Sequence, residues 1–104
     1  MSNVGPNKAM FTWINKQGVR SSEGFEVQFT GRLTTEYREG SRHLEVKVED
    51  AGNGMIDFNP KAFERWANSP VRNDPVEQTR MLKNFMAALE FQGLKGMPYE
   101  RPGT

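Results

Sequence analysis

One segment near the C-terminus constrains the fold of this chain more than any other, because it has the local signals of an amphipathic helix. It begins with Asp74-Pro75-Val76-Glu77, where a capping aspartate, a proline at the first helical position and a glutamate at the third form a capping box. Apolar residues then follow the i, i+3, i+4, i+7 spacing of a buried stripe, at Leu82, Phe85, Met86 and Leu89. Gly93 stands where a left-handed helix cap is expected. A single helix of this kind is marginally stable in water, so it requires an apolar surface to cover.

The residues before this helix predict that surface as a β-sheet. Apolar and polar residues alternate with the period of half-buried strands, and the expected dry face comprises Phe25, Val27, Phe29, Leu44, Val46 and Val48. Shorter strand-like runs occur at 11–14, 19–21, 33–37 and 55–58. Between two runs, Asn53-Gly54 favours a tight hairpin because both residues accept a positive φ. We therefore expect an α+β fold, in which an antiparallel sheet packs against the long C-terminal helix.

A short helix is expected between the sheet and the long helix. Asn59 and Pro60 suit the N-cap and the first helical position. Phe63 and Trp66 would then share one side of a helix that ends near Pro70, so Trp66 is assigned to the core.

The chain is expected to form one domain, over residues 11–96. Residues 1–10 are polar and are predicted to be a flexible arm, and residues 97–104 contain two prolines and are predicted to be a tail. Gly96 and Pro98 interrupt the segment after the long helix, so the sequence leaves open whether a last strand forms there.

The charge balance argues against binding driven by electrostatics. The 104 residues include 14 lysines and arginines against 13 aspartates and glutamates, a net charge of +1. A chain so nearly neutral is not typical of proteins that bind nucleic acid or membranes through charge. No apolar run approaches the roughly 18 residues that span a bilayer, and the first residues do not resemble a signal peptide, so a cytoplasmic location is expected.

The sequence offers little catalytic chemistry. With no cysteine and one histidine, His43, it lacks the ligands of a zinc site, and its glycines match no phosphate-binding loop. His43 is interpreted as a surface residue, although a small enzyme using it as a base remains an alternative. Glu36 and Glu45 are predicted to share one sheet face, where cross-strand ion pairs with Arg38 and Lys47 explain them more simply than a hydrolytic acid pair. We predict no catalytic, metal or cofactor site.

The candidate contact residues are those expected to be exposed: Trp13, Tyr37, Arg38, Arg42 and Glu45. Large aromatic and arginine side chains are typical anchors of protein interfaces. The alternative is a nucleic-acid-binding domain, in which Tyr37 stacks on bases beside Arg32, Arg38 and Arg42. Acidic residues at Glu36 and Glu39 interrupt that cluster, which makes this alternative weaker.

The segment 25–93 resembles a family of small bacterial proteins identified as polymorphic-toxin immunity proteins or uncharacterised domains. The matching features are the run from Tyr37 to Glu49, the pair Arg65-Trp66, and the helix end from Ala87 to Gly93. The resemblance implies a sheet-plus-helix domain that binds a protein partner. We therefore predict a non-enzymatic protein-interaction module, with an immunity role as its sharpest version. A monomer or weak homodimer is expected, because nothing obvious protects the edge of the first strand.

Overall fold

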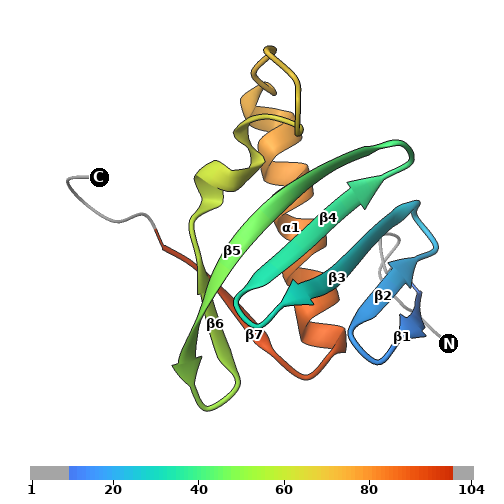
Figure 1. Ribbon diagram of the computed structural model, residues 1–104, viewed down its shortest axis with the longest axis vertical. Helices are drawn as coiled ribbons and strands as arrows, with labels where there is room; N and C mark the ends of the chain where they lie inside the picture. The colour runs from blue at the N-terminus through green and yellow to red at the C-terminus, as the bar shows by residue number, and fades with distance from the viewer. Residues whose placement is uncertain (1–9, 100–104) are drawn as a thin grey trace, which may run out of the picture.

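The computed structural model describes residues 10–99, and within them the chain forms one curled sheet and one long helix (Figure 1). Nearly all of the predicted arm, and residues 100–104 of the predicted tail, lie outside the described residues. The strands are β1 (Phe11–Asn15), β2 (Gly18–Ser21), β3 (Phe25–Gly31), β4 (Thr34–Glu39), β5 (Arg42–Gly52), β6 (Met55–Phe58) and β7 (Lys95–Pro98). The helices are the 3-10 helix η1 (Pro60–Glu64) and the α-helix α1 (Pro75–Phe91). The predicted α+β fold is confirmed.

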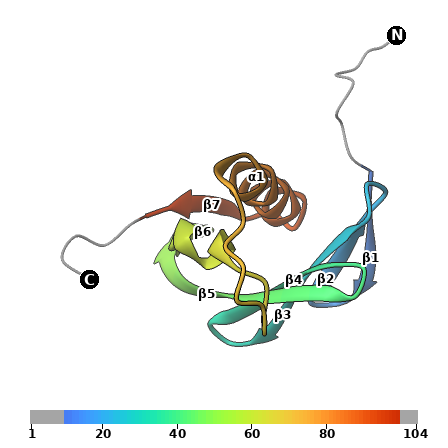
Figure 2. The same cartoon turned by 90° about the horizontal axis from the view of Figure 1, so that it is seen from above.

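The seven strands lie in the sheet in their sequence order. Every neighbouring pair is antiparallel except β6 and β7, which run parallel because α1 connects them as a crossover. The eleven residues of β5 pair with β4 over their first half and with β6 over their second half. The sheet curls around one side of α1 (Figure 2).

The predicted dry face of the sheet forms the core. Of its six residues only Phe29 is partly buried, and the other five are less than 5% exposed. The buried face of α1 is rotated slightly about the helix axis from the predicted apolar stripe. Phe85 and Leu89 are fully buried as expected, but Leu82 and Met86 lie at the border of the core, because Met81 and Ala88 occupy its centre.

The short helix differs from its prediction. Asn59 caps it by accepting the Lys61 N–H at 2.9 Å, as expected, but the helix is a single 3-10 segment that ends at Glu64. Arg65 is already extended, with φ −146°, so Trp66 reaches the core from the loop and not from a helical turn. Its assignment to the core is confirmed, since only 7% of Trp66 is exposed.

Two turns form at the residues where the sequence predicts positive φ values. Asn53 and Gly54 both have positive φ, 56° and 77°, and close the hairpin between β5 and β6. Gly93 has φ 86° and ends α1, where the Leu94 N–H bonds back to the Leu89 carbonyl at 2.9 Å.

A last strand does form after α1. The strand β7 includes Gly96, Met97 and Pro98, so two residues expected in the tail belong to the sheet. A Cβ on Gly96 would lie 3.2 Å from side-chain atoms of Leu89 and Met86. Gly96 therefore interrupts no strand, and its missing side chain suits the close approach of β7 to α1.

Candidate protein-interaction surface

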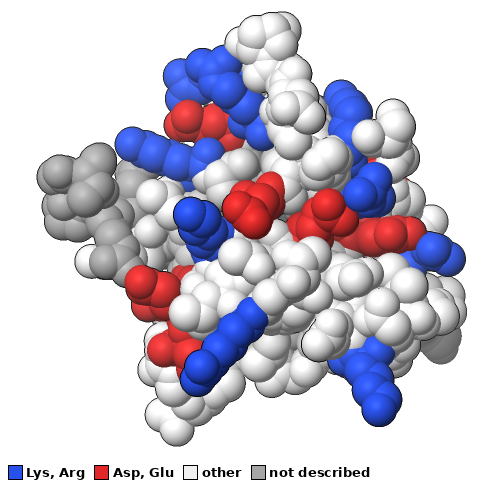
Figure 3. All heavy atoms as spheres, viewed as in Figure 1, with Lys and Arg blue, Asp and Glu red and all other residues white. Residues whose placement is uncertain are grey.

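The sheet face turned away from α1 is a mixed-charge surface, which we call the outer face. Its residues alternate with the buried ones along β2–β5, and they are Arg20, Glu26, Gln28, Glu36, Arg38, His43, Glu45 and Lys47. Figure 3 shows acidic and basic side chains intermixed over these strands. No single sign of charge dominates the face in this view.

Two of the predicted contact residues lie on the outer face. Arg38 pairs with Glu36 of the same strand, with N and O atoms 3.2 Å apart. Glu45 is exposed and lies directly opposite Glu36 on the neighbouring strand. Arg38 also lies opposite His43, which is a half-buried outer-face residue. Glu36 does form an ion pair, but with Arg38 of its own strand β4 and not across strands as predicted.

Tyr37 is not a contact residue, and its prediction as an exposed side chain is wrong. It is fully buried, because the alternation along β4 turns it with Thr35 toward α1. Its ring stacks on Phe25 and Trp66, with centroids 5.7 and 6.1 Å apart, and meets Phe63 edge-on. Tyr37 therefore offers no platform on which a base could stack.

The Tyr37 hydroxyl belongs to a polar network that joins β4 to α1. It donates to the Glu39 carboxylate at 2.5 Å and accepts from the Asn84 amide at 2.9 Å. Arg80 donates to both Glu39 oxygens, at 2.8 and 3.0 Å, and to Glu77 at 2.7 Å. Such a bidentate arginine–carboxylate contact fixes geometry as well as charge.

This network shifts the pKa values of its members. Burial and the hydrogen bond to Glu39 raise the pKa of Tyr37, so its hydroxyl remains a donor. Burial alone would raise the pKa of Glu39, but hydrogen bonds from Arg80 and Tyr37 hold it below its ordinary value. Glu39 is therefore ionised at neutral pH and its side chain is only 15% exposed. We interpret the network as structural.

Arg42 also lies apart from the outer-face residues. Its guanidinium carbon stands 4.7 Å from the centroid of the Trp66 ring, a cation–π arrangement. Arg42 is exposed to solvent and covers one face of a buried tryptophan. The predicted contact residues thus do not form one surface.

Trp13 is the centre of a different cluster, which the sequence did not predict. Its ring lies 5.8 Å from that of Phe91 at the end of α1, and Phe11 lies 5.3 Å from Phe91. Phe11 packs edge-on against buried Phe25, which ties the cluster to the core. Trp13 and Phe91 nevertheless remain 49% and 44% exposed. One signal was available, since Phe91 is a large apolar residue outside the helix's buried stripe.

The backbone of β1 is unpaired on one side within residues 10–99, because β1 is an end strand of the sheet. Ser22 donates its N–H to the Met10 carbonyl at 2.8 Å. Backbone groups alternate in direction along an antiparallel strand, so Thr12 also bonds inward, whereas Phe11 and Trp13 point theirs outward. We call this edge, with the side chains beside it, the β1 edge surface, made of Met10, Phe11, Trp13, Ile14 and Phe91.

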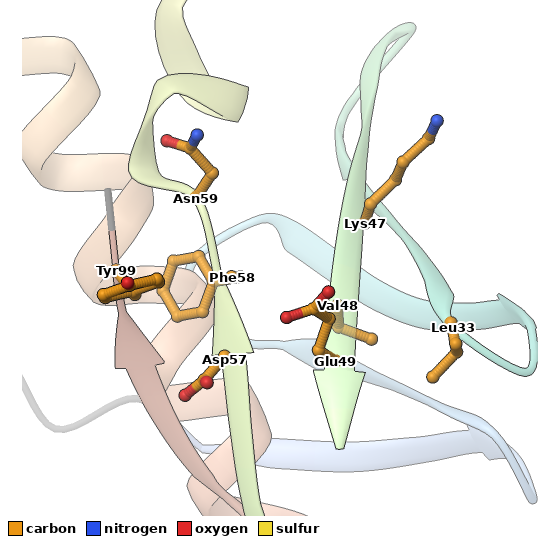
Figure 4. A pocket seen from close by; sticks show the side chains of 8 residues that line it. All are labelled: Leu33, Lys47, Val48, Glu49, Asp57, Phe58, Asn59 and Tyr99. Atoms are coloured by element: carbon orange, nitrogen blue, oxygen red, sulfur yellow. The ribbon is translucent and has the colours of Figure 1, made fainter. Parts of the chain in front are cut away.

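Two hollows lie at the opposite part of the sheet. The smaller, of about 310 Å³, is lined by residues of β5 and β6 and by Tyr99. Figure 4 shows Lys47 pointing away from the carboxylates of Glu49 and Asp57, so these charges do not converge on one point. The larger is an open groove of about 720 Å³ between the β3–β4 turn and the β5–β6 hairpin.

In residues 10–99, no group of three or more histidine, aspartate or glutamate side chains is placed to hold a metal ion. No helix in this part of the chain is both long and apolar enough to cross a membrane. In comparisons with known proteins, no family model, no curated protein and no solved structure matches the chain. The resemblance to immunity proteins therefore stays a prediction.

Proposed function

We propose that this chain is a non-enzymatic, cytoplasmic protein-interaction module whose β1 edge surface binds an extended segment of a partner protein. The observation that supports this most is the coincidence of two features in one place. An unpaired strand edge lies beside two large aromatic side chains that are about half exposed, Trp13 and Phe91. Each feature alone is common, but together they supply backbone hydrogen bonds and apolar side-chain contacts for the same partner segment.

Strand addition would use these features in different ways. The outward N–H and C=O groups of Phe11 and Trp13 would bond to the partner's backbone, which gives affinity without sequence preference. Trp13 and Phe91 would contact alternate side chains of the added strand, which gives specificity. The segment Phe11–Asn15 carries no charge, so the partner segment is expected to be uncharged and apolar at alternate positions.

An immunity role, in which the partner is a toxin, is the most specific form of this proposal. An inhibitor of a toxin needs a complementary surface with a few desolvated anchors, and no catalytic group of its own. If a toxin gene neighbours the gene for this chain, co-expression should protect cells from that toxin. Protection by the wild type and by Val71→Lys, together with its loss in Ile14→Lys, would support the role.

The nucleic-acid alternative loses its aromatic residue with the burial of Tyr37, and Arg38 is engaged by Glu36. A titration with single- and double-stranded oligonucleotides at low salt tests it directly. Binding that weakens steeply with added salt would favour the alternative over the protein-interaction module.

A displayed library of extended random peptides tests the proposed function without knowledge of the partner. The wild type should enrich uncharged peptides with apolar residues at alternate positions. Lysine at Ile14, which is 37% exposed on the edge strand, should abolish the enrichment. The matched control is Val71→Lys, because Val71 is a β-branched residue 68% exposed in the loop before α1. Enrichment that survives Ile14→Lys would refute the proposed site.

A further inference from the structure

The two edges of the sheet differ in their capacity to accept another strand. At the β7 edge, Lys95 and Tyr99 donate their N–H groups to β6, so the alternating residues Gly96 and Pro98 face outward. Proline has no N–H, and the strand has only four residues. The β7 edge is therefore protected against strand addition, whereas β1 has no charged residue, no proline and no covering segment within residues 10–99.

We propose that a second copy of this chain occupies the β1 edge surface, so that two β1 strands pair antiparallel about a two-fold axis near Trp13. The proposal deepens the proposed function, on which it rests, by naming the occupant of that same edge in the isolated protein. Because β7 disfavours strand addition, head-to-tail addition from molecule to molecule is disfavoured as well. Of the sheet edges described within residues 10–99, this leaves β1 pairing with β1, which closes into a dimer.

The strand is complementary to itself in this arrangement. A two-fold axis at Trp13 sets its outward N–H and C=O groups against those of the second copy. The same axis places Thr12 of one copy opposite Ile14 of the other, and two β-branched residues are a favourable cross-strand pair. On the opposite side of the strand, the two exposed indoles would bury area against each other and against Phe91.

Charge does not oppose this self-pairing. The strand Phe11–Asn15 contains no ionisable side chain, so like charges never meet across the axis. The whole chain carries a net charge of only +1, so long-range repulsion between copies is weak. A dimer built this way would cover the partner site, and a protein partner would have to displace the second copy in order to bind.

Sedimentation equilibrium over a range of concentrations tests the proposal on the full chain. The wild type should be in a concentration-dependent monomer–dimer equilibrium. Thr12→Lys and Ile14→Lys change exposed residues, and each should weaken dimerisation by at least about tenfold through charge repulsion and lost apolar contact. Val71→Lys should dimerise like the wild type, and circular dichroism should show all four proteins folded.

A wild type that stays monomeric throughout, or a dimer that persists in either β1 variant, would overturn the proposal. This outcome is distinguishable from a failure of the proposed function. A monomeric wild type that still selects peptides at β1 would refute self-pairing alone. A β1-dependent dimer that selects no peptide, even at peptide excess, would refute binding of a foreign segment while supporting the second copy.

Discussion

The Tyr37 hydroxyl should contribute measurably to stability, and Tyr37→Phe isolates it because the buried ring is kept. The change removes a hydrogen bond to the Glu39 carboxylate and one from the Asn84 amide. Net values for such bonds are about 1.5–3 kcal/mol with a charged partner and about 0.5–1.5 kcal/mol with a neutral one. Glu39 keeps both bonds from Arg80, so its charge is not left unpaired. We therefore expect a loss toward the lower end of about 2–4.5 kcal/mol in the free energy of unfolding.

Urea unfolding followed by tryptophan fluorescence measures this loss. Trp66 reports on the region directly, because its ring centroid lies 6.1 Å from that of Tyr37. The matched control is Tyr99→Phe, which removes a hydroxyl from a side chain that is 49% exposed and should change stability by less than about 0.5 kcal/mol. Asn84→Ala in the Tyr37→Phe background should cost less than in the wild type, because the two side chains share one bond. If Tyr37→Phe matches the Tyr99→Phe control, the assignment of the network as structural is refuted.

Three further variants test packing, capping and charge. Gly96→Ala should destabilise the protein by about 1–3 kcal/mol in chemical denaturation, because the new Cβ would lie 3.2 Å from a side-chain atom of Leu89. An unchanged denaturation midpoint would contradict this, because it would show that α1 shifts to accommodate the methyl group without loss of stability. Asp74→Ala should cost about 1 kcal/mol in the same assay by removing the cap, which accepts a helix N–H at 2.8 Å, and Asp74→Asn should restore most of it. Glu39 has a lower pKa when folded than when unfolded, so its contribution is present above about pH 4.5 and is lost as the pH falls through the folded value. Stability should therefore fall more steeply with acid in the wild type than in Glu39→Gln, and equal slopes would contradict the lowered pKa.

The features predicted well from the sequence were those with local causes. Asp74 caps α1 by accepting a backbone N–H only three residues further along the chain, so the contact depends on local sequence alone. Asn53 and Gly54 form a turn because both residues accept a positive φ. Alternation likewise fixed the buried face of β3 and β5, since a strand places successive residues on opposite sides.

The features predicted poorly depend on which distant segments meet. Arg80 binds Glu39 across 41 residues, and neither residue signals the other in the sequence. The prediction that Tyr37 is exposed is wrong, although its place in the alternation with Thr35 indicates the core. Gly96 is typical of a strand breaker by composition, but the close approach of α1 to β7 leaves little room for a Cβ there.

The order of elements explains why the two edges of the sheet end in different kinds of strand. After β6 the chain leaves the sheet, forms α1 and returns as β7, so the crossover adds the closing strand on the β6 side. The first strand has no such neighbour on its outer side within residues 10–99, and the last residue of α1, Phe91, contacts both Phe11 and Trp13. The side of Trp13 that Phe91 leaves uncovered is the part of the molecule where an added strand would gain both backbone bonds and apolar area. The topology thus favours β1 as the place where a partner binds, over the charged outer face that carries Arg38 and Glu45.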